Sequence, residues 1–352
     1  TTTTTTSDQY KQATNSGDLS EIFHEPCNAA PAKTLTVAAD SAAAVGRGAS
    51  VSYNSAVTTT ARISAGWRLD LERYGRRAFY FAELTRLNRP IGTWLLLWPV
   101  LWSLWIAADG SPRPLVFVVF ILGVVVMRSA GCAFNDLADK DVDPFVKRTR
   151  DRPIAARRVS PLEGLVLFVL LLLMALALVL QLDATTIKLS LVGAFFAVTY
   201  PFFKRFFPIP QFYLGLAFSW SVPMVFMAQL GAVPRVGWTL FIGAVIWTTA
   251  YDTLYAMVDR DDDVKLGVRS SAILFGDMDR VIVAALQAMT LVALYLVGDS
   301  MRFGMWYQLG VVGAAVFFVY QQWLIRNRDR EGCLRAFFNN NFAGMAVFIG
   351  VV

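Results

Sequence analysis

Residues 114–144 read PLVFVVFILGVVVMRSAGCAFNDLADKDVDP, an apolar run followed at once by a cluster of acidic and amide side chains. The apolar part, Pro114 to Cys132, is long enough to cross a bilayer as a helix. A second cluster, DRDDD at residues 259–263, follows another apolar run that begins near Trp238. Carboxylates at the ends of membrane helices are costly to place there, so we interpret the two clusters as a functional site.

The composition is typical of a polytopic membrane protein. The chain has 352 residues, of which 56% are hydrophobic and 16% charged, against about 25% charged residues in ordinary soluble domains. The apolar residues fall into long blocks, which predicts an all-α fold of transmembrane helices embedded in a lipid bilayer. The net charge of +6 comes largely from Lys and Arg between these blocks, so it does not indicate a nucleic-acid partner.

The cysteines and the histidine exclude other chemistry. Cys27, Cys132 and Cys333 are an odd number without metal-ligand spacing, so we expect free thiols. The single histidine, His24, lies in a polar stretch. A histidine-based metal site or catalytic triad is therefore not expected.

Three regions follow one another along the chain. Residues 1–66 are rich in Thr, Ser, Ala and Asn without apolar periodicity, which predicts a disordered polar tail. Residues 67–90 interleave Arg with Leu, Phe and Tyr, which predicts an amphipathic interfacial lead-in. Residues 91–352 are expected to form the transmembrane domain. The sequence does not begin with Met, and its last apolar block, Phe342 to Val352, is too short to span, so we expect a trimmed chain with a truncated ninth helix.

The transmembrane domain contains nine apolar segments, which we place at residues 91–108, 115–135, 164–181, 187–203, 211–231, 238–258, 281–297, 305–325 and 342–352. Lys and Arg crowd the connections after the second, fourth, sixth and eighth segments and are sparse in the others. By the positive-inside rule, the N-terminus and both acidic clusters then face the cytoplasm, or the matrix in a mitochondrion. Of the two, we favour a bacterial cytoplasmic (inner) membrane.

The spacing of the carboxylates predicts metal binding. On a continuous helix, Asn135, Asp139 and Asp143 would share one face with Asp136 beside them, and Asp252, Asp259 and Asp263 would share another. Like charges on one face repel and need cations between them. Hard oxygen ligands suit Mg²⁺, which typically bridges carboxylates to phosphate groups. The alternative reading, solvated loop acids that balance nearby Lys and Arg, is favoured only for Asp141, Asp261 and Asp262.

Cationic side chains near the clusters fit a diphosphate, although each could instead only set the topology. They are Lys204 and Arg205 after the fourth segment, Lys147, Arg148, Arg150 and Arg152 after the first cluster, and Lys265 after the second. Arg128 differs because it lies inside the second segment, seven residues before Asn135. A buried arginine needs an anionic partner, which could be an aspartate of the cluster or a substrate carboxylate. Aromatic rings near the clusters, at Tyr200, Tyr251 and Tyr255, could line a cavity in which a carbocation forms.

This constellation resembles the UbiA superfamily of intramembrane prenyltransferases. The resemblance is carried by Asn135-x-x-x-Asp139-x-x-x-Asp143, Asp259-x-x-x-Asp263 and four longer stretches, RLNRPIGTWLLLWP at 86–99, MRSAGCAFND at 127–136, YDTLYAMVDRDDDVK at 251–265 and FNNNF at 338–342. These stretches are most similar to the branch that acts on 4-hydroxybenzoate. The similarity covers about residues 80–352, and one departure is Asn88, where the family usually has Asp.

The resemblance implies a nine-helix bundle around a central cavity, with Mg²⁺ and a polyprenyl diphosphate at a polar cap. It implies metal ligation, and with it catalysis, by Asp139, Asp143, Asp259 and Asp263. It implies substrate binding by Asn135, Asp136, Arg128, Arg148, Tyr200, Lys204 and Arg205. The implied reaction ionises the prenyl diphosphate and attaches the prenyl group ortho to the hydroxyl of 4-hydroxybenzoate, a step in ubiquinone biosynthesis, with a carboxylate such as Asp259 assisting proton loss.

Two alternatives stay open from the sequence. The enzyme could prenylate another acceptor, such as homogentisate, a naphthoate, haem or a chlorophyllide precursor. A cation or organic-ion transporter could also place carboxylates in membrane helices, although both clusters here lie at one face rather than at mid-membrane.

Overall fold

A computed structural model describes residues 74–145, 149–203, 206–266 and 269–352. The predicted polar tail and the first residues of the lead-in lie outside this part of the chain. Residues 74–84 form a lead-in helix. The helices after it are α2 (Ile91–Ala107), α3 (Pro114–Ala138), α4 (Pro161–Val179), α5 (Ala184–Phe203), α6 (Pro210–Ser219), α7 (Ser221–Leu230), α8 (Arg235–Leu266), α9 (Ser271–Phe275), α10 (Asp279–Met301), α11 (Met305–Leu324) and α12 (Arg330–Val351).

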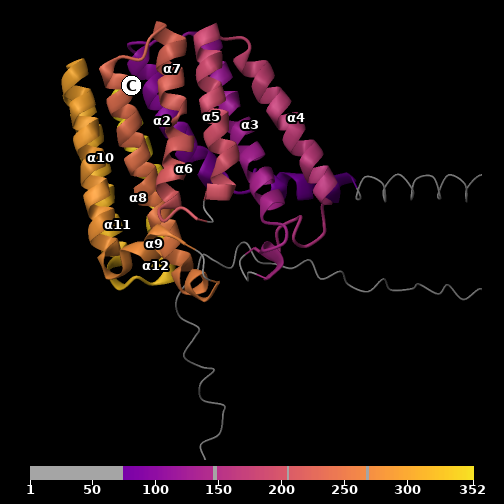
Figure 1. The fold of residues 1–352 in the computed structure, drawn as a ribbon. Helices are drawn as coiled ribbons and strands as arrows, with labels where there is room; N and C mark the ends of the chain where they lie inside the picture. Colours follow the sequence, from indigo (N-terminus) through magenta and orange to yellow (C-terminus); the bar gives the residue numbers. More distant parts are fainter. Residues whose placement is uncertain (1–73, 146–148, 204–205, 267–268) are drawn as a thin grey trace, which may run out of the picture. The chain divides into compact units, whose positions relative to one another are not determined.

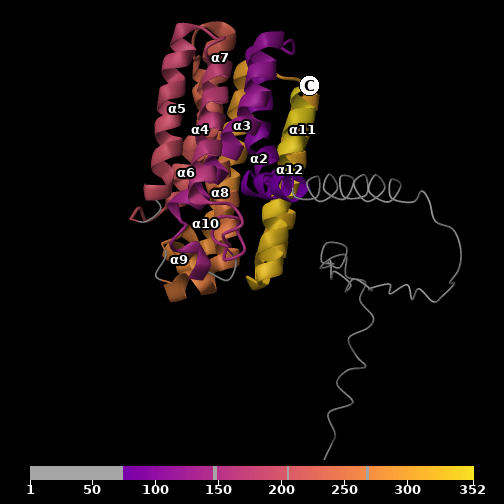
Figure 2. The ribbon, with the colours of Figure 1, turned by 90° about the vertical axis from the view of Figure 1, so that its right-hand side faces the viewer.

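The long helices stand side by side as a membrane bundle (Figures 1 and 2). Seven of them are long and apolar enough to cross a membrane when α6 and α7 are taken together, and α2 is a shorter apolar helix of 17 residues. α6 and α7 form one rod that is interrupted at Trp220. With α2 and α12 included, the described residues contain nine rods, which confirms the predicted number of segments.

The ninth rod is longer than the sequence analysis predicts. α12 begins at Arg330, where the side chain of Asp329 accepts a hydrogen bond from the backbone N–H of Gly332, and it extends over 22 residues. At about 1.5 Å per residue, this length matches a hydrocarbon core of about 30 Å. The expected start of this segment at Phe342 is therefore wrong, because the helix begins twelve residues earlier.

Three consecutive asparagines explain why hydropathy misses the first half of α12. Each accepts a hydrogen bond of 3.0 Å from a side chain of a different helix: Asn339 from Gln321 of α11, Asn340 from Trp247 of α8 and Asn341 from Trp98 of α2. Because the amide groups face other helices instead of lipid, a polar sequence is compatible with a membrane helix here. These contacts fix α12 between α2, α8 and α11.

α8 is the most enclosed of the membrane helices, and α4 lies at the periphery. In the most apolar window of α8, 72% of the residues are buried, against 6% in α4. Trp247 of α8 is 1% exposed and packs against Trp102 of α2 with ring centroids 5.1 Å apart. The second acidic cluster therefore belongs to the central helix of the bundle.

The two acidic clusters differ in local structure, although α3 and α8 end at the same end of the bundle (Figure 1). α8 continues to Leu266, so Asp252, Asp259 and Asp263 share one helical face as predicted. α3 instead ends at Ala138, and Asp143 begins a short 3-10 turn that also contains Pro144. The single face predicted for Asn135, Asp139 and Asp143 is therefore wrong beyond the first turn.

Candidate functional site

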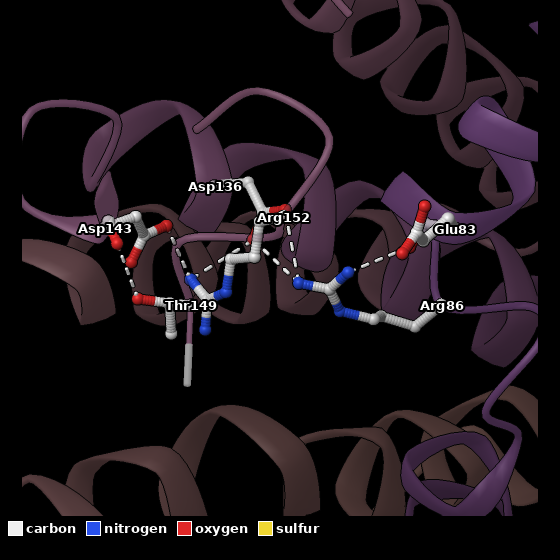
Figure 3. A network of polar contacts seen from close by, with 6 residues as sticks. All are labelled: Glu83, Arg86, Asp136, Asp143, Thr149 and Arg152. Atoms are coloured by element: carbon white, nitrogen blue, oxygen red, sulfur yellow. Dashed lines mark hydrogen bonds and ion pairs between the residues drawn. The ribbon is translucent and has the colours of Figure 1, made fainter. Parts of the chain in front are cut away.

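A buried ionic network holds the first acidic loop in place (Figure 3). Asp136 is 2% exposed, and its two carboxylate oxygens accept hydrogen bonds from Nη2 of Arg86 at 3.0 and 3.2 Å. Nη1 of Arg152 lies 3.3 Å from Asp136 and donates to Asp143 at 2.8 Å. Thr149 completes the network by donating its hydroxyl to the backbone carbonyl of Asp143 at 3.1 Å.

The network balances two buried carboxylates with two arginines. Asp143 is 5% exposed, and this burial raises the pKa of its carboxyl, while the positive charge of Arg152 acts in the opposite direction. Arg86 comes from the segment before α2, and Arg152 comes from the connection between α3 and α4. The network therefore closes the α3–α4 connection on itself through Arg152 and ties it to the distant segment before α2 through Arg86.

The second acidic cluster is partly neutralised by α12. Asp259 is 6% exposed, and Nη2 of Arg330 lies 3.8 Å from it and 2.6 Å from Asp262. The contact with Arg330 agrees with the interpretation of Asp262 as an acid that balances a nearby cation. Asn135, Asp139, Asp259 and Asp263 all interact with further neighbouring groups.

A set of polar side chains connects the first cluster with the interior of the bundle. The phenol of Tyr200 on α5 is near enough to interact electrostatically with Arg128 of α3, with Asp139 directly after α3, and with Asp252 of α8. The phenol of Tyr251 on α8 also interacts electrostatically with Arg128 and Asp252. These side chains therefore come together from three helices, inside the bundle and near the end that carries both clusters.

Arg128 lies at the centre of this convergence. Its guanidinium carbon stands 5.8 Å from the ring centroid of Phe218 on α6. Its contacts with the described residues include this ring and the backbone of α2 at Gly92.

The carboxylates of the two acidic clusters have the donor chemistry that a divalent cation requires. In the described ranges, no three His, Cys, Asp or Glu side chains stand close enough together to form a closed metal cage. The carboxylates of Asp139, Asp143, Asp259 and Asp263 are hard oxygen donors of the kind that Mg²⁺ prefers. Asp136 is instead paired with Arg86 through both carboxylate oxygens and lies 3.3 Å from Arg152, so two arginines already neutralise its charge.

The predicted residues divide into three groups. Arg128, Tyr200 and Asp139 come together with Asp252 of α8, whereas Asp259 is near Arg330 of α12. Asp136 and Asp143 belong to the ionic network. Arg148, Lys204 and Arg205 lie outside the described residues.

Two arginines were missed as partners of the first cluster by sequence reasoning. The sequence analysis groups Arg152 with the cations that fit a diphosphate, and it places Arg86 in the basic lead-in and in a stretch similar to the family. The signal that could have identified them is the buried Asp136, since a carboxylate inside a membrane helix requires a cationic partner.

Comparisons with known proteins agree with this architecture. Residues 96–343 match the UbiA prenyltransferase family. The 4-hydroxybenzoate octaprenyltransferase of Alkalilimnicola ehrlichii is 56% identical over 276 residues, which cover 78% of this chain and 94% of that protein. The 4-hydroxybenzoate octaprenyltransferase of Pseudomonas fluorescens strain Pf0-1 is 52% identical over 282 residues, which cover 80% of this chain and 95% of that protein.

Solved structures share the fold at lower identity. The apo structure of a UbiA homolog from Aeropyrum pernix K1 gives a TM-score of 0.66 at 22% identity, covering 73% of this chain and 96% of that one. A UbiA homolog from Archaeoglobus fulgidus bound to GPP and Mg²⁺ gives a TM-score of 0.60 at 17% identity, covering 76% of this chain and 99% of that one. The family match spans well over half of the chain, and the nine-rod bundle agrees with it, so the chain belongs to the UbiA prenyltransferase family.

Proposed function

We propose that this membrane protein is a 4-hydroxybenzoate polyprenyltransferase. It transfers a polyprenyl group from polyprenyl diphosphate to the ring carbon ortho to the hydroxyl of 4-hydroxybenzoate, a step in ubiquinone biosynthesis. The observation that carries the proposal is the convergence of Arg128, Asp139, Tyr200 and Asp252 from α3, α5 and α8 below the acidic end of the bundle. The names of the relatives described above support the choice of acceptor.

The acidic end is proposed to bind the diphosphate together with Mg²⁺. Asp139, Asp143, Asp259 and Asp263 would hold the metal, and Asn135 would assist. Bound Mg²⁺ would neutralise the charge of the leaving diphosphate. One oxygen of Asp143 is occupied by Arg152, so this residue offers its other oxygen. Arg148, Lys204 and Arg205 are proposed to bind the diphosphate oxygens as cations.

The interior is proposed to bind the acceptor and to exclude water. Arg128 binds the carboxylate of 4-hydroxybenzoate, which orients the ring toward C1 of the prenyl chain. The C1–O bond breaks with its electron pair on the diphosphate, and the ring carbon ortho to the hydroxyl forms the new C–C bond. A carboxylate of the second cluster, such as Asp259, accepts the displaced ring proton. The aromatic interior keeps water away from the allylic cation.

We propose that the acidic end faces the cytoplasm of a bacterial inner membrane. The chain between α3 and α4 carries seven Lys and Arg residues, Lys140, Lys147, Arg148, Arg150, Arg152, Arg157 and Arg158, whereas the connection between α2 and α3 carries only Arg113. Such a bias favours the cytoplasmic side for the first connection. A single cysteine introduced at Asp141 should react with a membrane-impermeant reagent only from that side, and reaction from the periplasmic side would contradict the topology.

The decisive experiment is turnover by the purified protein with matched variants. Wild type, Asp139→Asn, Asp259→Asn and the control Asp299→Asn are given 4-hydroxybenzoate, Mg²⁺ and prenyl diphosphates of several lengths, and products are identified by mass spectrometry. Asp299 is an exposed aspartate of α10, so its variant should keep wild-type rates. The two site variants should lose at least about 100-fold in turnover. Ion flux through vesicles without prenylated product would instead favour a transporter.

A further inference from the structure

Because Gly92 has no side chain, it leaves open the space that the guanidinium of Arg128 occupies. The residue is buried near the start of α2, and a Cβ added to it would stand 2.4 Å from Nη2, 2.7 Å from Nε and 2.8 Å from Cζ of Arg128. The guanidinium therefore rests directly against the backbone of α2. Every residue other than glycine would place an atom in the volume that it occupies.

Backbone conformation does not explain a glycine at this position. Gly92 lies inside a helix and is not among the residues of positive φ. Glycine is less favourable than alanine in a helix, so the local preference would be for a side chain. The contact with Arg128 is the physical reason for glycine that the structure provides.

The contact fixes one side of Arg128, and other helices fix the rest. The ring centroid of Phe218 lies 5.8 Å from the guanidinium carbon, and the phenols of Tyr200 and Tyr251 are near enough to interact with its charge. Arg128 is only partly buried, so the described residues do not enclose it completely. The position of its guanidinium therefore depends on how closely this group can approach the backbone of α2.

We infer that Gly92 is a positioning residue that sets where Arg128 holds the carboxylate of the acceptor. The inference rests on the acceptor role proposed for Arg128. An ordinary van der Waals contact begins at 3.4 Å, so a Cβ at residue 92 displaces the guanidinium by about 1.0 Å, the difference between 3.4 and 2.4 Å. The displaced atoms are the far end of a flexible side chain, so the protein folds while the binding geometry changes.

The test compares glycine-to-alanine variants with and without the arginine. The variants are Gly92→Ala, Arg128→Ala and the double variant, with Gly131→Ala as the control. Gly131 lies on α3, three residues after Arg128, and a Cβ there would meet no atom within 4 Å. The measurement is the Kd of radiolabelled 4-hydroxybenzoate and of neutral 4-hydroxybenzamide by equilibrium dialysis in detergent, with the KM values for both substrates alongside.

The inference predicts that Gly92→Ala weakens the binding of 4-hydroxybenzoate only when Arg128 is present. Gly92→Ala should raise the Kd and KM for 4-hydroxybenzoate by about 10-fold or more, as expected for a guanidinium displaced by about 1 Å. The Kd for 4-hydroxybenzamide and the KM for polyprenyl diphosphate should change by less than about twofold, because neither ligand uses the carboxylate contact. In the Arg128→Ala background, Gly92→Ala should have no further effect.

The outcomes separate this inference from the proposed function. If Gly92→Ala behaves like Gly131→Ala, or weakens binding equally with and without Arg128, the inference is wrong while the proposed function stands. If wild type binds 4-hydroxybenzoate through Arg128 and Gly92 but makes no prenylated product, the proposed function fails and the inference survives. If wild type does not prefer 4-hydroxybenzoate over 4-hydroxybenzamide, the acceptor role of Arg128 and this inference both fail.

Discussion

Removing Arg152 should destabilise the protein through the two carboxylates that it bridges. Asp136 and Asp143 are 2% and 5% exposed, and Nη1 of Arg152 lies 3.3 Å from the first and 2.8 Å from the second. With Arg86 and Arg152 present, the four side chains carry no net charge. In Arg152→Ala they carry one uncompensated negative charge, and Arg86 reaches only Asp136.

The magnitude follows from the burial of the two acids. Breaking a buried ion pair by removing one partner costs about 3–5 kcal/mol. Arg86 still neutralises Asp136, and the side chain of Arg152 is 16% exposed, so we expect the lower end of this range. A loss of about 3 kcal/mol in the free energy of unfolding corresponds to a fall of roughly 6–12 °C in Tm for a domain of a few hundred residues.

The assay is thermal unfolding of the metal-free protein in detergent, with Arg158→Ala as the control. Arg158 lies in the same connection, but its ion pair with Glu83 is long, at 3.5 Å, and its side chain is 39% exposed, so its removal should cost less than about 1 kcal/mol. Adding Asp143→Asn to Arg152→Ala should restore most of the lost stability, since the unpaired charge disappears. An Arg152→Ala protein that melts like the control, or a double variant without recovery, would refute the reasoning.

Two further predictions concern stability. At the start of α5, burial of Asp183 raises the pKa of its carboxyl, but the hydrogen bonds from Thr186 and Thr185 together outweigh this effect and lower the pKa. Its contribution to stability is therefore present above the ordinary carboxyl pKa and is lost as the pH falls through the lowered value. Asp183→Ala should therefore lower stability by about 0.5–2 kcal/mol at pH 7, with the difference from wild type shrinking toward pH 3 in thermal unfolding scans; an equal difference at both pH values would contradict the assignment. At residue 344, a Cβ would stand 2.5 Å from Cδ1 of Trp98 and 2.9 Å from Cη2 of Trp247. Because both indoles are fixed by hydrogen bonds to α12, Gly344→Ala should cost about 1–3 kcal/mol in the same assay, and a neutral effect would mean that the indoles can shift.

The number of membrane rods and the location of the acidic clusters could be predicted from the sequence. Long apolar blocks have few ways to satisfy their backbone in lipid other than as helices, so composition and length determine the rods locally. The spacing of Asp252, Asp259 and Asp263 was interpretable for the same reason, because they lie on one uninterrupted helix.

The end of α3 and the full length of α12 could not be predicted in this way. The acidic loop departs from helical geometry after Ala138, so a spacing of four residues there no longer indicates a common face. The first half of α12 carries asparagines whose hydrogen bonds go to other helices, and a hydropathy average cannot distinguish them from polar groups exposed to water.

Residue types and their order along the chain thus determined the class of the protein, its membrane rods and the end that carries the carboxylates. Only the tertiary structure decided the partners. Asp136 pairs with Arg86 across 50 residues, and Gly92 of one helix makes room for Arg128 of another. The physical reason is that helix formation and membrane insertion depend on local sequence, whereas ion pairs and steric contacts depend on which helices pack together. The bundle brings these residues within a few ångströms of each other, and their sequence positions alone do not.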